Sequence, residues 1–258
     1  MLMTKQDFAK KIRQSKKIVE TLCATDINEA DTVFHLGNFL SDAFGYDNIT
    51  DISREFAVRS TYCDYAIKIN DKLAFMIEVK AMPVQLKDNH LRQVIGYAMN
   101  AGVEWCLLTN CKEFRFYHIE FTKPIDKKLV FSTNLLADDI KEIIEKLWYL
   151  TKASFRKNEI LNYWNAISAL SDFNLATALL SPEIIKQARR VLKKNTGAHL
   201  DSIQIAQAIR KLFDDSLNIK ITLKRPLKPK FQNHLTNKGN EKELTEVSLD
   251  KQIKGDVG

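Results

Sequence analysis

Long apolar runs are missing from this sequence of 258 residues, and their absence argues against a membrane-spanning helix. No stretch approaches the roughly 20 consecutive apolar residues that a helix needs to cross a bilayer. The first residues, MLMTKQDFAKKIRQSKK, are polar and basic, and they lack the apolar core of a secretory signal. We therefore expect a cytoplasmic protein with no membrane partner.

Cysteine, glycine and histidine are too few or too scattered for several common kinds of site. The 4 cysteines form no CxxC pair and have no pair of histidines nearby, which argues against a zinc site and a disulfide framework. The 8 glycines form no phosphate-binding loop, so nucleotide hydrolysis is not expected. The 5 histidines lack the spacing of a nucleophile-base pair or an HNH-type site, and we expect each to be structural: His35, His90, His118, His199 and His234.

Negative charge is scarce in the C-terminal part of the chain. Residues 1–150 carry 20 Lys and Arg against 21 Asp and Glu, whereas residues 151–258 carry 19 against 11. The whole excess of the +7 net charge therefore lies after residue 150. The phosphates of a nucleic acid would bind such a surface through Lys and Arg. A solvated basic surface without a partner fits the charge equally well.

Two amphipathic helices are predicted at the start of the chain, over residues 5–22 and 26–47. The second ends near Gly45, a residue type suited to a helix C-terminal cap. Glu29 lies four residues before Val33, on the same stripe as the apolar residues of this helix. A carboxylate in line with a core-facing stripe is unusual, although a first-turn Glu is also favoured by the helix dipole.

From Ile49 the pattern changes to short segments rich in β-branched and aromatic residues, which predict five strands. Between the third and fourth, residues 86–102 have a helical apolar face, so the two strands should be parallel and joined by a right-handed crossover. The last two strands are separated by Asn110, Cys111 and Lys112, which is short enough for a hairpin. The predicted strands are 49–60, 64–69, 73–80, 104–110 and 113–119.

After Pro124 the strand signals stop, and the pattern predicts helices over 137–155, 181–195 and 201–213. Ser181 is expected to cap the second of these, with Pro182 at the first helical position. From about Lys224 the chain is polar, which predicts a mobile tail. The predicted organisation is an α/β domain over residues 1–125, a helical region over 126–222, and a polar, flexible tail over 223–258.

Three charged residues lie in the strand pair CDYAIKINDKLAFMIEVKA, residues 63–81. Glu78 and Lys80 project from the same side of their strand because side chains alternate between faces. The position of Asp64 depends on the hairpin. A two-residue turn, Asn70-Asp71, turns Asp64 away from Glu78, whereas a three-residue turn, residues 70–72, places Asp64 opposite Glu78.

We predict the three-residue turn because it aligns apolar partners on one face, Ile67 with Phe75 and Tyr65 with Ile77. Two clustered carboxylates repel each other unless a cation offsets their charge. Mg²⁺ is the natural candidate, since it prefers carboxylate and carbonyl oxygens and keeps waters that can become nucleophiles. Lys80 could orient or help deprotonate such a water and stabilise charge on a phosphate. A surface Glu-Lys pair beside an unrelated Asp is the alternative.

This arrangement resembles the PD-(D/E)xK nuclease superfamily, in which an Asp opens one strand, E-x-K lies on the next and an acidic residue lies on the preceding helix. GYDNITDISREFAV, the strand pair and LRQVIGYAMNAGVEWCLLTNCKEFRFY together resemble the nuclease domain at the N-terminus of type I restriction enzyme motor subunits and standalone proteins with that domain. The resemblance covers residues 28–119. It implies a restriction-endonuclease-like core over residues 1–125, an α/β fold with a mixed central sheet of about five strands flanked by helices, followed by the helical region.

The resemblance also implies roles for particular residues. Lys80 would be the catalytic lysine, and Gln93 and Tyr97 match a Q-x-x-x-Y pair that would orient the site or contact DNA. Their i, i+4 spacing puts both on one helix face. The chain departs from the pattern at Cys63, in place of Pro, and at Cys111, in place of the glycine usual in this turn. The implied metal ligands are Asp64, Glu78, the main-chain carbonyl of Val79, and Glu29.

The leading hypothesis is a Mg²⁺-dependent endonuclease that hydrolyses DNA, with Mn²⁺ able to substitute; the resemblance adds a role in restriction or phage defence. DNA is the expected partner, and the C-terminal helices could also bind another protein or a second copy. The alternatives are a catalytically silent nucleic-acid-binding or assembly module, against which the full Asp, Glu and Lys set argues, and a purely structural helical scaffold. The basic residues expected to hold the phosphate backbone are Lys186, Arg189, Arg190, Lys193 and Lys194.

Overall fold

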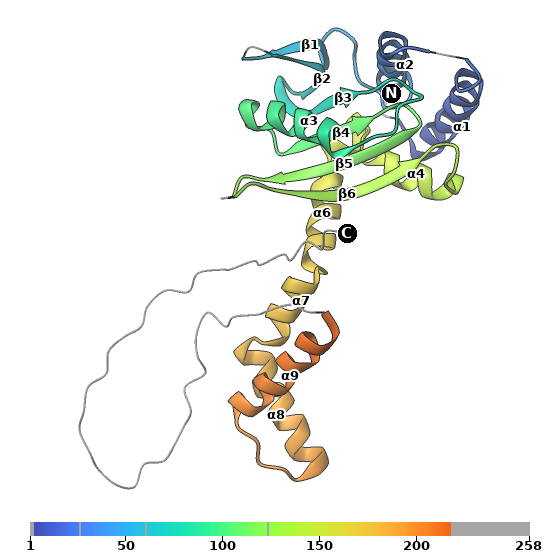
Figure 1. Cartoon of the computed structure of the whole chain (residues 1–258). Coiled ribbons are helices and arrows are strands. Elements are labelled where there is room, and N and C mark those ends of the chain that lie inside the picture. Colours follow the sequence, from blue (N-terminus) through green and yellow to red (C-terminus); the bar gives the residue numbers. More distant parts are fainter. Residues whose placement is uncertain (1–2, 26, 60, 123, 218–258) are drawn as a thin grey trace, which may run out of the picture. The chain divides into compact units, whose positions relative to one another are not determined.

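The computed structural model describes residues 3–25, 27–59, 61–122 and 124–217. The chain divides into two compact units, Met1–Asn165 and Ala166–Gly258, each with its own apolar core (Figure 1). The tail predicted over residues 223–258 lies outside the described residues.

The first unit is built on a mixed six-stranded sheet with the strand order β1-β2-β3-β4-β5-β6. β3 and β4 are parallel, and the other neighbouring strands are antiparallel. The α/β class and the mixed central sheet are therefore as predicted. The strands are β1 Ile52–Val58, β2 Thr61–Ile69, β3 Lys72–Val79, β4 Trp105–Thr109, β5 Glu113–Glu120 and β6 Asp126–Asn134.

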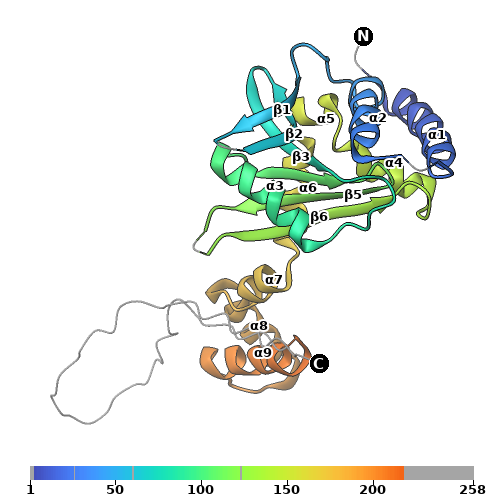
Figure 2. The same ribbon diagram turned by 45° about the horizontal axis from the view of Figure 1, so that its top comes forward.

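Helices cover both faces of this sheet (Figure 2). On one face α3 buries Leu91 and Val94 against Met76 and Leu108. The opposite face is aromatic, and there Phe39 of α2 lies with its ring centroid 5.7 Å from that of Phe114. The helices of this unit are α1 Lys5–Leu22, α2 Glu29–Asp42, α3 Asp88–Ala101, α4 Ile140–Trp148, α5 Lys152–Arg156 and α6 Glu159–Ala169, the last of which runs past Asn165.

The α3 crossover is confirmed, since it joins the parallel strands β3 and β4. It ends at Gly102, whose φ of 68° is left-handed and suits a helix C-terminus. The hairpin between β4 and β5 is also confirmed. Its Cys111 has a φ of 64°, which explains why glycine is usual at this position in the family that the sequence resembles.

Two predictions about residues 126–155 were wrong. Residues 126–134 form β6, an antiparallel neighbour of β5, although the sequence predicted that strands stop after Pro124 and that a helical region begins at residue 126. The alternation of apolar and polar residues is hidden at the polar start of β6. This strand lies at the edge of the sheet, where its side chains reach solvent. The single helix predicted over 137–155 is two helices, since Thr151 caps α5 by accepting a hydrogen bond from the Ser154 amide.

The second unit contains α7 Asp172–Leu179, α8 Pro182–Thr196 and α9 Ser202–Leu217. Ser181 caps α8 with Pro182 in its first turn, as predicted, and α9 covers the other predicted helix. Ile185 and Ile205 are buried together between these helices. Across the described ranges, no helix has the length and apolar character required to cross a membrane.

Candidate active site

The β2–β3 hairpin sets the position of Asp64 by a route that the sequence did not predict. Its turn has two residues, Asn70 and Asp71, because Ile69 pairs with Lys72. Both turn residues have positive φ, 51° and 64°, as the favoured two-residue hairpin turn requires. The predicted three-residue turn was therefore wrong.

A β-bulge corrects the register further along the same hairpin. The pairing shifts between Ile67 and Lys68, so that Ile67 pairs with Phe75 and Tyr65 with Ile77, as predicted. A bulge adds one residue to one strand and so exchanges the faces that its side chains occupy. The predicted alignment of Asp64 with the end of β3 is therefore confirmed, although the turn differs.

Four charged side chains from β2, the end of β3 and the start of α2 come together. The Asp64 Oδ2 atom accepts a hydrogen bond of 2.7 Å from the Val79 amide. The Lys80 Nζ atom lies 2.6 Å from Glu78 Oε1 and 3.7 Å from Glu29 Oε1. Glu78 is 2% exposed, whereas Glu29 is 51% exposed, so the cluster runs from the interior to the surface.

The electrostatics of this cluster are dominated by burial and excess negative charge. Burial raises the pKa of Glu78 to about 7, and the charges of Asp64 and Glu29 add to the rise although Lys80 opposes it. Burial also raises the pKa of Asp64, against the hydrogen bond from Val79. For Lys80, burial lowers the pKa, but the hydrogen bond and charge of Glu78 outweigh it and the net pKa is raised. Three carboxylates thus share one ammonium, which leaves room for a further cation.

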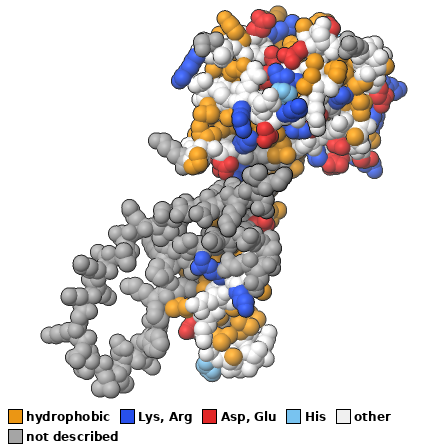
Figure 3. Space-filling model, viewed as in Figure 1, with side chains coloured by type: hydrophobic (Ala, Val, Ile, Leu, Met, Phe, Trp, Pro, Cys, Tyr) orange, Lys and Arg blue, Asp and Glu red, His pale blue; other side chains and the backbone are white. Residues whose placement is uncertain are grey.

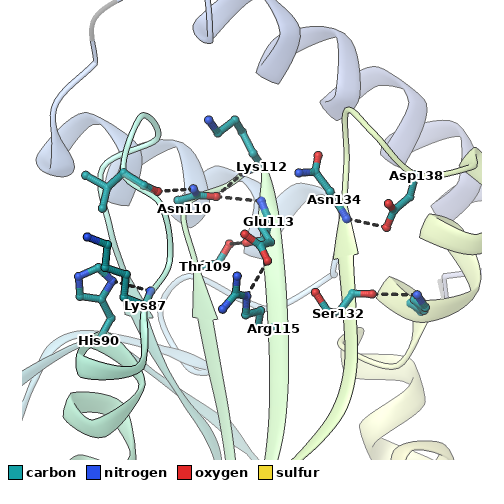
Figure 4. Close-up of polar contacts among 12 residues, drawn as sticks. Lys87, His90, Thr109, Asn110, Lys112, Glu113, Arg115, Ser132, Asn134 and Asp138 are labelled. Atoms are coloured by element: carbon teal, nitrogen blue, oxygen red, sulfur yellow. Dashed lines mark hydrogen bonds and ion pairs between the residues drawn. The ribbon is translucent and has the colours of Figure 1, made fainter. Parts of the chain in front are cut away.

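The chain after Lys80 is fixed by hydrogen bonds that sequence reasoning missed. The hydroxyl of the buried Thr32, on α2 one turn after Glu29, accepts a hydrogen bond of 3.1 Å from the Met82 amide. The Asn110 side chain donates to the Val84 carbonyl at 2.8 Å and accepts from the amides of the β4–β5 turn (Figure 4). Thr32 carries no sequence signal for this contact, because it depends on how α2 packs beside β3.

Gln93 and Tyr97 share a face of α3, as predicted. The Gln93 side-chain amide donates a hydrogen bond of 2.8 Å to the Tyr97 hydroxyl. Burial raises the pKa of Tyr97, and the charges of Glu78 and Asp64 raise it further. Tyr97 therefore lies within electrostatic range of both carboxylates.

The donor chemistry of the cluster fits Mg²⁺ in part. Among the residues that the structure describes, no three His, Cys, Asp or Glu side chains are grouped closely enough to hold a metal ion by themselves. Asp64 and Glu78 are hard oxygen donors whose charge Lys80 offsets only in part, and Mg²⁺ commonly uses one or two carboxylates and keeps several waters. The ligand roles of the Val79 carbonyl and Glu29 stay predictions.

The predicted nucleic-acid-binding residues are all exposed on α8, in the second unit. Their i, i+3, i+4, i+7 and i+8 spacing places them on one side of the helix. Basic side chains reach the surface of both units (Figure 3). The residues concerned are Lys186, Arg189, Arg190, Lys193 and Lys194.

Comparison with known proteins supports the resemblance stated from sequence. Residues 34–129 match the family model of the type I restriction enzyme R protein N terminus. This range contains the strand pair and the α3 pair but not Glu29. The chain therefore contains a restriction-nuclease-like domain.

One solved structure and no curated protein matched the chain. The structure is the type IIG restriction endonuclease BpuSI, at a TM-score of 0.34 and 18% identity. The match covers 64% of this chain and 22% of that one.

Proposed function

We propose that this restriction-nuclease-like domain is a metal-dependent endonuclease that hydrolyses phosphodiester bonds of DNA. Its cofactor would be Mg²⁺, with Mn²⁺ able to substitute, and its setting would be restriction or phage defence in the cytoplasm. The observation that carries the proposal is the buried Glu78 carboxylate, held against Lys80 beside Asp64. A structural ion pair needs one carboxylate for one ammonium, and adding further acids to a partly buried site costs free energy unless a ligand offsets them.

The proposed roles are those that the resemblance implies. Asp64 and Glu78 would hold the ion together with the Val79 carbonyl, and the exposed Glu29 carboxylate would have to move closer to become a further ligand. When bound, the ion supplies Lewis-acid polarisation of the phosphodiester and lowers the pKa of water. Lys80 keeps its proton because the neighbouring carboxylates raise its pKa, so it offers positive charge and hydrogen bonds to a phosphate oxygen.

Two other groups of residues have supporting roles in this proposal. Gln93 donates to the Tyr97 oxygen, which leaves the Tyr97 hydroxyl proton free to point toward the carboxylates or a bound phosphate. The basic residues of α8 would hold the phosphate backbone of DNA, and such binding weakens steeply as salt rises.

A catalytically silent nucleic-acid-binding or assembly module is the second candidate. The observation in its favour is that Lys80 already pairs with both Glu78 and Glu29, which lets the fold stand without a metal ion. A protein partner, or a second copy bound through the C-terminal helices, would fit this module as well as the enzyme.

The deciding experiment is cleavage of supercoiled plasmid and of a labelled single strand with Mg²⁺, Mn²⁺ or EDTA. Lys80→Ala and Asp64→Ala should each reduce nicking by at least about 100-fold, as loss of a catalytic electrostatic group does. Lys72→Ala, an exposed lysine at the other end of β3, is the matched control and should cut like the wild type. A wild type that binds DNA in a salt-dependent way but cuts nothing would favour the silent module.

A further inference from the structure

His90 lies on the same face of α3 as two of the site residues. Gln93 and Tyr97 follow it at i+3 and i+7, which is one side of a helix. A crossover helix runs antiparallel to the strands that it joins, so the start of α3 lies at the end of β3 where Lys80 follows. This face therefore runs from Tyr97, beside Glu78 and Asp64, toward His90 at the Lys80 end.

The electrostatic environment of His90 agrees with this placement. Burial lowers its pKa, the ammonium of Lys80 lowers it further, and the charge of Glu29 raises it. Lys87, three residues before His90, also lowers its pKa, so two of the three charges that act on His90 belong to the charged cluster. His90 is only half-buried and lies outside the described apolar cores, so its structural contact is the hydrogen bond from the Lys87 amide at the start of α3.

One nitrogen of the His90 ring is already occupied. Nδ1 accepts a hydrogen bond of 3.3 Å from the Lys87 amide at the start of α3 (Figure 4). A neutral imidazole whose Nδ1 is the acceptor carries its proton on Nε2. Within the described part of the chain, this Nε2–H group has no hydrogen-bond acceptor, so it is available to a ligand.

We propose that His90 is a further substrate-contacting residue, whose Nε2–H donates a hydrogen bond to a non-bridging oxygen of the phosphodiester that Lys80 faces. This inference rests on the proposed function, because it takes DNA as the substrate. It adds to the site a neutral donor on α3, at the opposite end of the helix face from Tyr97.

Three substitutions separate this role from a structural one. In His90→Asn the amide oxygen can still accept from Lys87, but the donor at the Nε2 position is lost. In His90→Gln the side-chain amide nitrogen reaches the Nε2 position and keeps the donor. His90→Ala removes both, and His199→Ala, an exposed histidine of the second unit, is the matched control.

Each variant of the full chain is measured in three ways. Single-turnover cleavage is followed with Mg²⁺, affinity for a fluorescein-labelled duplex is measured by anisotropy with Ca²⁺, and thermal unfolding reports stability. We expect the Ala and Asn variants to cleave about 10- to 100-fold more slowly, as for removal of a hydrogen bond to a charged group. The unfolding temperature should be unchanged in the Asn variant and slightly lower in the Ala variant, which also loses the hydrogen bond from the Lys87 amide. His90→Gln should recover most of the rate.

The outcomes are distinct. Wild-type rates and affinities in the Ala and Asn variants would overturn the inference while leaving the proposed nuclease intact. A Gln variant as slow as the Asn variant, with lowered unfolding temperatures in all three, would assign His90 a structural role and also overturn it.

If the wild type cuts nothing, the proposed function fails, and His90 is judged on binding alone. Weaker affinity in the Ala and Asn variants but not in the Gln variant, together with a DNA-induced shift of the His90 ¹⁵Nε2 signal, would support the contact. Equal affinities would overturn it.

Discussion

Replacing Glu78 by Gln tests whether the charged cluster lowers the folding stability of the metal-free chain. The carboxyl is 2% exposed, and burial raises its pKa from an ordinary value of 4.5 to about 7. A carboxyl whose pKa is higher in the folded than in the unfolded chain holds its proton more tightly when folded, so its ionisation costs folding free energy. This cost is absent below about pH 4.5 and is complete above about pH 7.

The magnitude follows from the two pKa values. Their difference corresponds to about 3 kcal/mol of lost folding free energy above about pH 7. Glu78→Gln removes this cost, and the 2.6 Å hydrogen bond from Lys80 is already counted in it, because Lys80 lowers the pKa of Glu78. We expect the free energy of unfolding of the metal-free chain to rise by about 3 kcal/mol at about pH 8, and the gain to vanish near pH 4.5.

The assay is urea unfolding in EDTA at several pH values, followed by tryptophan fluorescence. Glu113→Gln is the matched control, because the Glu113 carboxylate lies 2.5 Å from Arg115 nearer the surface (Figure 4). A partly exposed pair contributes at most about 1 kcal/mol, so this variant should lose a little stability or none. If Glu78→Gln were clearly less stable than the wild type at about pH 8, Glu78 would be a net stabilising ion-pair partner, and the argument from excess charge would be refuted.

Three further predictions concern other parts of the chain. Of the 4 cysteines, only the exposed Cys23 should react with a thiol reagent in the native state, because the other three are buried and burial raises their pKa values; release of more than one equivalent would contradict this. Thr32→Val keeps the shape but leaves the Met82 amide unpaired, so urea unfolding should show a loss of about 1 to 3 kcal/mol and plasmid nicking should slow, whereas unchanged stability would show that the bond is dispensable. Replacing Arg189 and Arg190 by Ala should reduce the slope of log affinity for DNA against log salt by about 0.9 for each phosphate that is no longer neutralised, and an unchanged slope would exclude this face of α8 from the interface.

The sequence predicted which charged side chains come together, because strand alternation and hairpin pairing are strong constraints. Glu78 and Lys80 lie two residues apart, so they share a side of any strand, and the apolar partners of Tyr65 and Ile67 restrict where Asp64 can lie. The α3 crossover could also be predicted from the sequence, since a helix between two buried strands allows few chain arrangements.

Other features depend on tertiary structure and left little trace in the sequence. Thr32 looks like any helical threonine, and its contact with the Met82 amide exists only once α2 has packed beside the end of β3. β6 begins with Asp126, Lys127 and Lys128, whose charge hides a strand that pairs only because β5 offers a free edge. His90 was expected to be structural because the histidines are scattered along the sequence, and its proximity to Lys80 and Glu29 arises only from the packing of α3 and α2.

The bulge in the β2–β3 hairpin allows this segment to change in length without changing the site. Ala74 is the extra residue, since Lys68 pairs with Leu73 and Ile67 with Phe75. Removing Ala74 would leave the same partners paired in a regular hairpin, so Asp64 and Glu78 would stay on one side of the sheet. Relatives that keep the two carboxylates can therefore lack this one residue, a difference that can be read from aligned sequences without any structure.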